Sequence, residues 1–335
     1  MNASVLGAAE TFARLRGSLN IGAVHAGARK PFRFLLCGDP ALVAELRALL
    51  LDDQGADGYV ASDAAHTLET IDPNRTRTLD TLDARSVIFL GRASDRDGAR
   101  LDLLATLRLP ILALLVDENV SAPSGPAQPP QPGMIEDYVV SEMSLASLRG
   151  RFLPHLIDTC RGIEIAVGRR LPALRETVAA KLTRDAAFNA LKVSGASAVV
   201  DKVPLLGVVL GAFASAGDMM AITGIQMMLM LQIGATYGKD PDLAHAWELL
   251  PIVGGGFGWR AISRQFSGFI PVAGIVIKAA IAYAGTVVVG EGARVYFQYG
   301  RHMTADDGAK LYEETKATAM TLVREMVSKI TRGKF

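Results

Sequence analysis

The sequence predicts two kinds of domain in one chain, an α/β domain followed by an all-α module. Between about residues 30 and 150, short apolar runs alternate with helical patterns, which is typical of a parallel sheet with helices on its faces. Two long stretches follow, Val203–Gly238 and Gln265–Gly290, and each carries a single charged residue. A length of 335 residues fits two domains.

Composition argues against several functional classes. The formal net charge is +1 and no long run of Lys and Arg occurs, so we do not expect a nucleic-acid-binding protein. The two cysteines, Cys37 and Cys160, stand far apart, as in proteins of a reduced cytosolic compartment. We expect no metal, because the histidines have no ligand-like neighbours at metal-site spacing. We also expect no cofactor. These histidines are His25, His66, His155, His245 and His302.

Residues 1–29 are predicted to form an N-terminal arm. The segment lacks the apolar core of a secretory signal. One face of a helix here would gather four apolar side chains, those of Val5, Ala9, Phe12 and Leu19. Two interpretations fit this pattern, a short packing helix and an anchor on a membrane surface.

Residues 30–150 form the predicted α/β domain. Its strands are short, mostly apolar runs bounded by Gly, Pro and Asp: 31–39, 58–61, 86–94, 110–118 and 134–142. Helical spacing of apolar residues marks 41–51 and 99–107. Asp39 and Pro40 suit the start of the first helix, because Asp accepts from free N–H groups and Pro is tolerated at the first helical position. The Pro-rich segment Ser121–Gly133 is predicted to be an irregular loop.

This order of elements resembles the Ras-like GTPase fold of the bacterial Era-type families. The first strand of that fold carries the phosphate loop G-x-x-x-x-G-K-[ST], in which backbone N–H groups and the Lys hold phosphates and the hydroxyl holds Mg²⁺. Here Gly38 matches the first Gly, but Val43 replaces the second Gly, Ala44 the Lys and Glu45 the hydroxyl residue. The resemblance therefore implies a degenerate P-loop GTPase-like domain. An ordinary α/β domain of another lineage is the alternative.

The other nucleotide-binding elements of the family are also altered. The Asp-x-Pro-Gly element is assigned to the sequence DTLD that begins at Asp80. The guanine-reading Asn-Lys-x-Asp element is replaced by VDEN, in which Asp117 is the second residue. Of the final Ser-Ala pair, only Ser141 remains. The resemblance thus implies a pseudo-GTPase without catalytic or cofactor-binding residues.

The segment 151–303 is predicted to be an apolar helical module. Apolar spacing predicts helices over Ser147–Val167 and from Leu174 to Leu191, separated by Pro172. The module resembles the YcjF-like domain of unknown function, a membrane-associated helical module found fused to or beside bacterial GTPases. The features that carry the resemblance are, in order, Leu171-Pro172-x-Leu174-Arg175, Asn189, Pro204, Asp218 with Gln226, Tyr237-Gly238, the run GGGFGW from Gly254, a Pro-initiated apolar helix from Pro271, and RVYFQYG from Arg294. It implies an accessory role beside a GTPase-like domain.

Asp218 and Lys278 are the lone charges of the two apolar stretches. The part of the first stretch after Asp218 is about 20 residues long, enough for a helix to cross a bilayer core of roughly 30 Å. Because a buried charge is costly without a partner, the two residues are expected to face a polar cavity or each other. Alternatively, Asp218 caps a helix that starts at Met219. The stretches lie either in lipid or in the core of a helical bundle.

The last segment, 304–335, has the pattern of an amphipathic helix. For the whole chain, the leading hypothesis is a non-enzymatic pseudo-GTPase scaffold or adaptor at the cytoplasmic face of the inner membrane. Protein partners, self-association into a homo-oligomer, and membrane lipid are the expected interactions. The alternatives are an atypical GTP-binding switch, and a small transporter or pore built from the apolar helices. A cytoplasmic location is the alternative to the membrane face.

Overall fold

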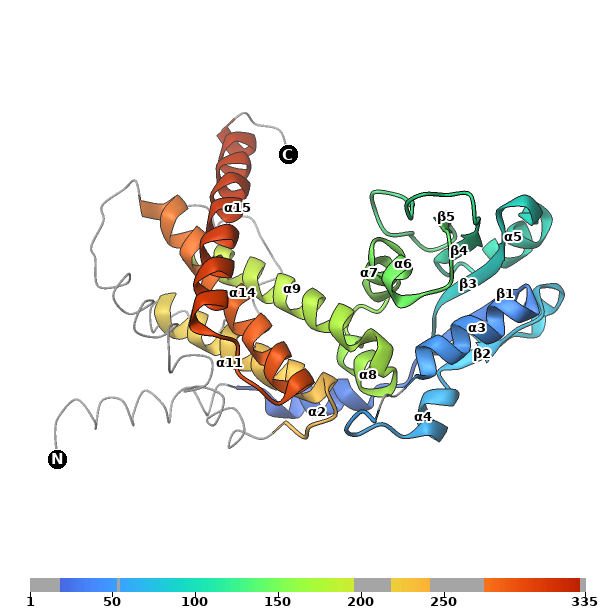
Figure 1. Cartoon of the computed structure of the whole chain (residues 1–335), viewed down its shortest axis with the longest axis horizontal. Helices are drawn as coiled ribbons and strands as arrows, with labels where there is room; N and C mark the ends of the chain where they lie inside the picture. Colours follow the sequence, from blue (N-terminus) through green and yellow to red (C-terminus); the bar gives the residue numbers. More distant parts are fainter. Residues whose placement is uncertain (1–18, 53–54, 196–217, 242–273, 332–335) are drawn as a thin grey trace. The chain divides into compact units, whose positions relative to one another are not determined.

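The computed structural model describes four parts of the chain, residues 19–52, 55–195, 218–241 and 274–331 (Figure 1). They form two compact units. The first, which we call the α/β unit, consists of His25–Lys181 and Ala235–Lys239. The second, the helical unit, takes in the described residues of Leu182–Gly234 and Asp240–Phe335, together with those before His25. Compared with the predicted boundary at 150, the α/β unit extends through a further 31 residues, from 151 to 181.

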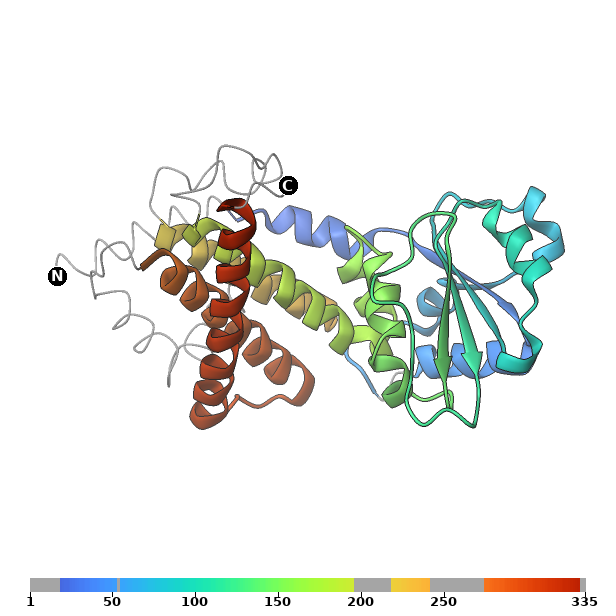
Figure 2. The same ribbon diagram turned by 90° about the horizontal axis from the view of Figure 1, so that it is seen from above.

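The α/β unit is built on one sheet of five parallel strands in the order β2-β1-β3-β4-β5 (Figures 1 and 2). This confirms the predicted parallel sheet. Its central strands are nearly all apolar because helices cover both faces. The strands are β1 (Arg33–Gly38), β2 (Leu68–Thr70), β3 (Ala84–Arg92), β4 (Ile111–Val116) and β5 (Ile135–Val140).

Helices lie on both faces of the sheet, as the handedness of the connections requires. From β1 the chain moves outward to β2 through α3 (Pro40–Leu51), whereas from β3 it moves the other way to β4 through α5 (Gly98–Ala105). Right-handed crossovers in opposite directions place their helices on opposite faces. Leu101 and Leu104 of α5 accordingly pack on one set of alternating strand residues. On the other face, α3 contacts β1 and β3, and α7 (Phe152–Asp158) contacts β4.

One predicted strand was wrong. Residues 59 and 60 have no regular structure, and Ala61–Ala65 form the short helix α4. β1 pairs with β3 on one side and with the edge strand β2 on the other, and β2 was not predicted from the sequence. The β2 strand has only three residues, of which only Leu68 is fully buried, so it shows neither an apolar run nor a clear alternation.

The predicted helix over Ser147–Val167 is divided in three. The pieces are α6 (Leu145–Arg149), α7 and α8 (Glu164–Arg170). Gly162, at φ +76°, takes a left-handed conformation that ends the regular pattern before α8. The helix predicted after Pro172 is present as α9 (Arg175–Gly195), which follows the turn η3 (Pro172–Leu174). The remaining short elements are α2 (Ile21–Arg29), η1 (Pro73–Thr78) and η2 (Ala93–Asp95).

The helical unit contains the second part of α9 together with α11 (Asp218–Thr236), α14 (Gly274–Tyr299) and α15 (Ala305–Thr331). Glycines allow two close contacts within it. A Cβ on Gly234 of α11 would lie 2.9 Å from the Phe297 ring of α14, and one on Gly290 of α14 would lie 2.9 Å from Thr183 Cβ of α9. The α15 helix confirms the predicted amphipathic tail, and Thr304 caps it by accepting from the N–H of Asp307.

The apolar stretches form interior helices in the described part of the chain. On α11, the hydrophobic side chains from Ala221 to Tyr237 are buried, apart from a half-buried Met228. A helix that is apolar all round is expected in a protein core or in a membrane. Among the described residues, no helix combines the length and the apolarity needed to cross a bilayer. Parts of both stretches, 203–217 and 265–273, lie outside the described residues.

Candidate functional site

The carboxyl edge of the sheet is the natural place for a site, because open parallel sheets bind ligands where the strand order reverses. Here that point lies between β1 and β3, whose connections leave in opposite directions. The polar residues at this edge end or follow successive strands: Asp39 after β1, Asp72 after β2, Arg92 at the end of β3, Asp117 after β4 and Ser141 after β5. Of the predicted positions, the structure therefore brings Gly38, Asp117 and Ser141 to one edge.

The turn between β1 and α3 is one residue long. Gly38 ends β1 with φ +116°, and a Cβ there would lie 2.8 Å from the backbone N and C of Leu90 on β3, and closer still to its carbonyl oxygen. Only glycine fits such an approach. Asp39 follows and donates its N–H to the Leu90 carbonyl at 2.8 Å, and α3 starts at Pro40. β1 and α3 are therefore joined without an intervening loop.

The Asp39 side chain takes the place that an anion would need. Its Oδ1 accepts from the N–H groups of Ala41 at 2.8 Å and Leu42 at 3.2 Å, as the sequence predicted for a capping residue. These are the free N–H groups that a phosphate uses when it binds at a helix N-terminus. A carboxylate already held there opposes a second anion through both occupancy and charge.

The positions that the resemblance aligns with the Lys and the hydroxyl residue of a phosphate loop lie on regular helix. Ala44 and Glu45 are exposed residues of the second turn of α3, whereas Val43 beside them is buried in the core. Glu45 is therefore a solvated surface carboxylate.

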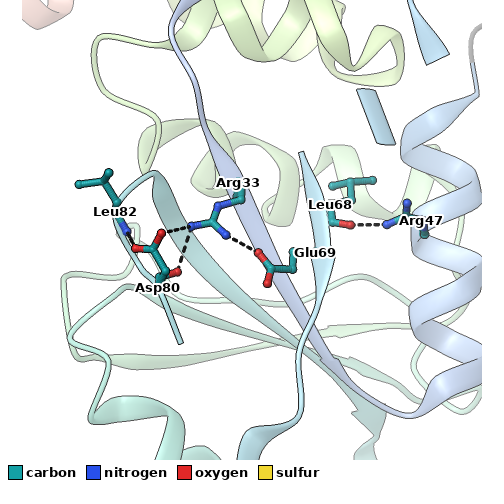
Figure 3. A network of polar contacts seen from close by, with 6 residues as sticks. All are labelled: Arg33, Arg47, Leu68, Glu69, Asp80 and Leu82. Atoms are coloured by element: carbon teal, nitrogen blue, oxygen red, sulfur yellow. Dashed lines mark hydrogen bonds and ion pairs between the residues drawn. The ribbon is translucent and has the colours of Figure 1, made fainter. Parts of the chain in front are cut away.

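Asp80 lies at the other edge of the sheet (Figure 3). It precedes β3, and its carboxylate accepts from the N–H of Leu82 at 2.9 Å and lies 3.7 Å from the Arg33 guanidinium. Arg33 also forms a 2.6 Å ion pair with Glu69 of β2. The Asp80 side chain is 75% exposed. It stabilises a turn at the amino ends of the strands and is not assembled with Gly38 and Asp117.

Asp72 is the aspartate that follows β2 at the carboxyl edge, and the sequence analysis did not single it out. It accepts from both the backbone N–H of Asn74 at 2.9 Å and the side-chain amide of Asn74 at 3.0 Å. Asp117 makes the same pair of contacts with Asn119, each at 3.0 Å. Both are local turns of a common type. The Asp-Pro pair at 72–73 was the available signal, but β2 had to be found first.

This edge carries arginines as well as carboxylates. Arg92 forms an ion pair with Glu118 at 3.5 Å, and both side chains are exposed. In the part of the chain that the structure describes, no group of three or more His, Cys, Asp or Glu residues is arranged to hold a metal ion. Cys37, one residue before Gly38, is buried, and this burial raises the pKa of its thiol to about 12. A neutral buried thiol is not a nucleophile.

The two lone charges of the apolar stretches are only partly described. Asp218 is the first residue of α11 and Lys278 belongs to α14, and their side chains lie outside what the structure describes. A different polar contact joins these helices. Gln226 Nε2 lies 3.3 Å from Thr286 Oγ1, which in turn donates to the Ala282 carbonyl at 2.8 Å. The sequence analysis noted Gln226 but did not predict this partner.

Comparison of the chain with protein-family models, with curated proteins and with solved structures gives no match. The resemblances to Era-type GTPases and to the YcjF-like module therefore stay predictions. They rest on the order of elements and on the residues quoted above.

Proposed function

We propose that this protein is a non-enzymatic scaffold or adaptor, in which a degenerate GTPase-like domain and a helical module act through protein partners or self-association. One observation carries the proposal. The Asp39 carboxylate caps α3 directly after β1, at the helix end that a nucleotide phosphate would have to reach. Exposed Ala44 and Glu45 on regular helix support the same conclusion, because Ala44 offers no cation to a phosphate and the Glu45 carboxylate would repel one.

The test is nucleotide binding and hydrolysis by the purified full chain. A ligand at 100 times its Kd stabilises a protein by about 2.7 kcal/mol, which is a readily measured thermal shift. We expect no shift and no titration heat with 1 mM GTP, GDP or ATP in the presence of Mg²⁺. Phosphate release should match the rate without protein.

A contaminating GTPase is the main source of a false positive, so the Asp117→Ala variant is assayed in parallel. Asp117 organises the loop after β4 at the carboxyl edge. Saturable, Mg²⁺-dependent hydrolysis that falls in Asp117→Ala would contradict the proposal and favour the atypical GTP-binding switch. Hydrolysis that is equal in both proteins would come from a contaminating GTPase. Once that contaminant is removed, we expect no phosphate release above the rate without protein.

The proposed location is the cytoplasmic face of the inner membrane, with the helical unit providing the attachment. Support comes from the apolar sequence of 203–217 and 265–273, which adds to the apolar helices α11 and α14. The burial of α11 side chains favours attachment at the surface over insertion of α11 itself.

Cell fractionation tests this location. We expect the protein in the membrane fraction and its release by alkaline carbonate. Retention through both high salt and carbonate would indicate an integral protein and would reopen the transporter or pore hypothesis. In that case, Asp218→Asn and Lys278→Met should change flux in liposomes. Recovery in the cytosolic fraction would remove membrane attachment but leave the adaptor role.

A further inference from the structure

The exit of helix α11 is held inside the α/β unit. The last turn of α11 and the residues after it, Ala235–Lys239, belong to that unit, although the rest of α11 belongs to the helical unit. A single helix is therefore shared between the two units. Among the described residues, Asp57, Gly168 and Arg175 of the α/β unit contact this end of the helix and the residues after it.

A buried arginine is at the centre of these contacts. Arg175, the first residue of α9, is only 6% exposed. Its Nη2 donates to the Asp57 carbonyl at 2.6 Å, and its Nε donates to the Gly168 carbonyl at 3.2 Å. Its guanidinium also lies over the Tyr237 ring, 5.6 Å from the centroid. A planar guanidinium combines directed donors with stacking in a way that Lys cannot.

Two glycines allow the backbones to meet. Gly58 has φ +68° and Gly238 has φ +86°. A Cβ on Gly238 would lie 2.8 Å from the carbonyl carbon of Asp57, and one on Gly58 would lie 2.8 Å from Gly238 Cα. Next to the two glycines, Lys239 forms a 2.6 Å ion pair with the Asp57 carboxylate. Nothing larger than glycine fits between these two turns.

The loop 55–59, which contains Asp57 and Gly58, follows α3 and is hydrogen-bonded to its last residue. Tyr59 donates its hydroxyl proton to the carbonyl of Leu51, the last residue of α3, at 3.1 Å. The α3 helix also packs against η3, which directly precedes Arg175. The helix that starts at the carboxyl edge of the sheet thus ends beside the residues that hold α11.

We propose that these contacts form a latch that couples the loop after α3 to helix α11, so that a change in either one alters the other. The latch consists of Asp57, Gly58, Gly168, Arg175, Tyr237, Gly238 and Lys239. The coupling is reciprocal, as thermodynamic linkage requires. It does not depend on whether the α/β unit is related to GTPases.

Hydrogen exchange of the full chain, followed by mass spectrometry, tests the first direction. Gly238→Ala should open the latch, because its Cβ meets the Asp57 backbone. Gly133→Ala is the matched control, since Gly133 has φ +78° but no atom within 4 Å of a Cβ. We expect Gly238→Ala to raise exchange at least tenfold over Gln226–Gly234, upstream of the latch, with sheet amides unchanged.

The second direction uses a change inside the helical unit. Gly234→Ala pushes against Phe297 and should speed exchange in the loop 55–59 several-fold. In the Gly238→Ala background, adding Gly234→Ala should not speed exchange of the loop 55–59 any further. If Gly238→Ala fails to fold, Arg175→Lys is used in its place. That variant keeps the positive charge but loses the planar guanidinium with its two directed hydrogen bonds.

Two results would overturn the coupling. One is faster exchange confined to Ala235–Lys239, with Gln226–Gly234 unchanged. The other is equal exchange of the loop 55–59 in the wild type and in Gly234→Ala. Either would reduce the latch to a local packing contact.

Discussion

Replacing Gly38 with alanine tests whether the β1–β3 junction has room for a ligand. The new methyl group would lie 2.8 Å from two backbone atoms of Leu90 and closer to a third. Backbone atoms of a central strand cannot rotate away as a side chain can. The variant must therefore separate β1 from β3 at the point where their connections diverge.

The cost of Gly38→Ala has two main parts. Holding a non-glycine residue at φ +116° costs about 1–3 kcal/mol. Separation of the strands also breaks the hydrogen bond from the Asp39 N–H to the Leu90 carbonyl, which contributes about 1 kcal/mol. Together they amount to about 2–4 kcal/mol. A native domain is stable by only about 5–15 kcal/mol.

Urea unfolding of the full chain, followed by far-UV circular dichroism, measures this loss. With a slope of about 2 kcal/mol per molar urea, the midpoint should fall by about 1–2 M. Gly133→Ala is the control, because it carries the conformational cost of a positive φ without a collision. Equal stability of the two variants would mean that β1 and β3 can part without cost. The argument that no phosphate fits there would then fail.

Three further predictions concern side-chain packing inside one or the other unit. Gly290→Ala should destabilise the chain by about 1–3 kcal/mol, because its Cβ meets Thr183, and adding Thr183→Ala should recover part of that loss in urea unfolding. The Cys160 thiol has a pKa raised by burial from 9.0 to about 12, so the unfolded chain ionises first and stability falls as the pH rises from about 9 to 12. Unfolding at each pH should show that Cys160→Ala removes about 1.4 kcal/mol per pH unit from that decline, and an unchanged slope would contradict the burial of the thiol. Tyr138→Phe removes a buried 2.9 Å hydrogen bond to His155 and should cost about 1 kcal/mol, and a double-mutant cycle with His155→Phe should show a coupling of similar size.

The sequence predicted elements well where burial leaves a local pattern. The runs that became β1, β3 and β4 are mostly apolar because both faces of the sheet are covered there, so burial shows as consecutive apolar residues. The cap by Asp39 was also predictable, since Asp-Pro at the start of a helical pattern has a local physical reason. The break in the helix predicted over Ser147–Val167 could also have been predicted, because the glycine at 162 lies at that break.

What was missed depends on pairing between distant residues. β2 exists because three residues pair with Phe34, Leu35 and Leu36, and nothing within the three reveals this. Once β2 is missing, the order of the sheet is unknown. Asp80 was then assigned to the candidate site, although it lies at the opposite edge from Gly38. The replaced phosphate-loop residues could be read from sequence, but their positions in space could not.

The capping of α3 by Asp39 also bears on how the protein can be regulated. A helix N-terminus that serves a phosphate is left with free N–H groups when the ligand departs, so its stability depends on the ligand. Here a carboxylate of the chain itself satisfies two of those groups at 2.8 and 3.2 Å. These two N–H groups are thus satisfied without a phosphate. A ligand can shift a conformational equilibrium only if it binds two states with different affinity. In the proposed latch, a partner that binds the loop after α3 would therefore change helix α11 only if it binds the closed and open latch with different affinity.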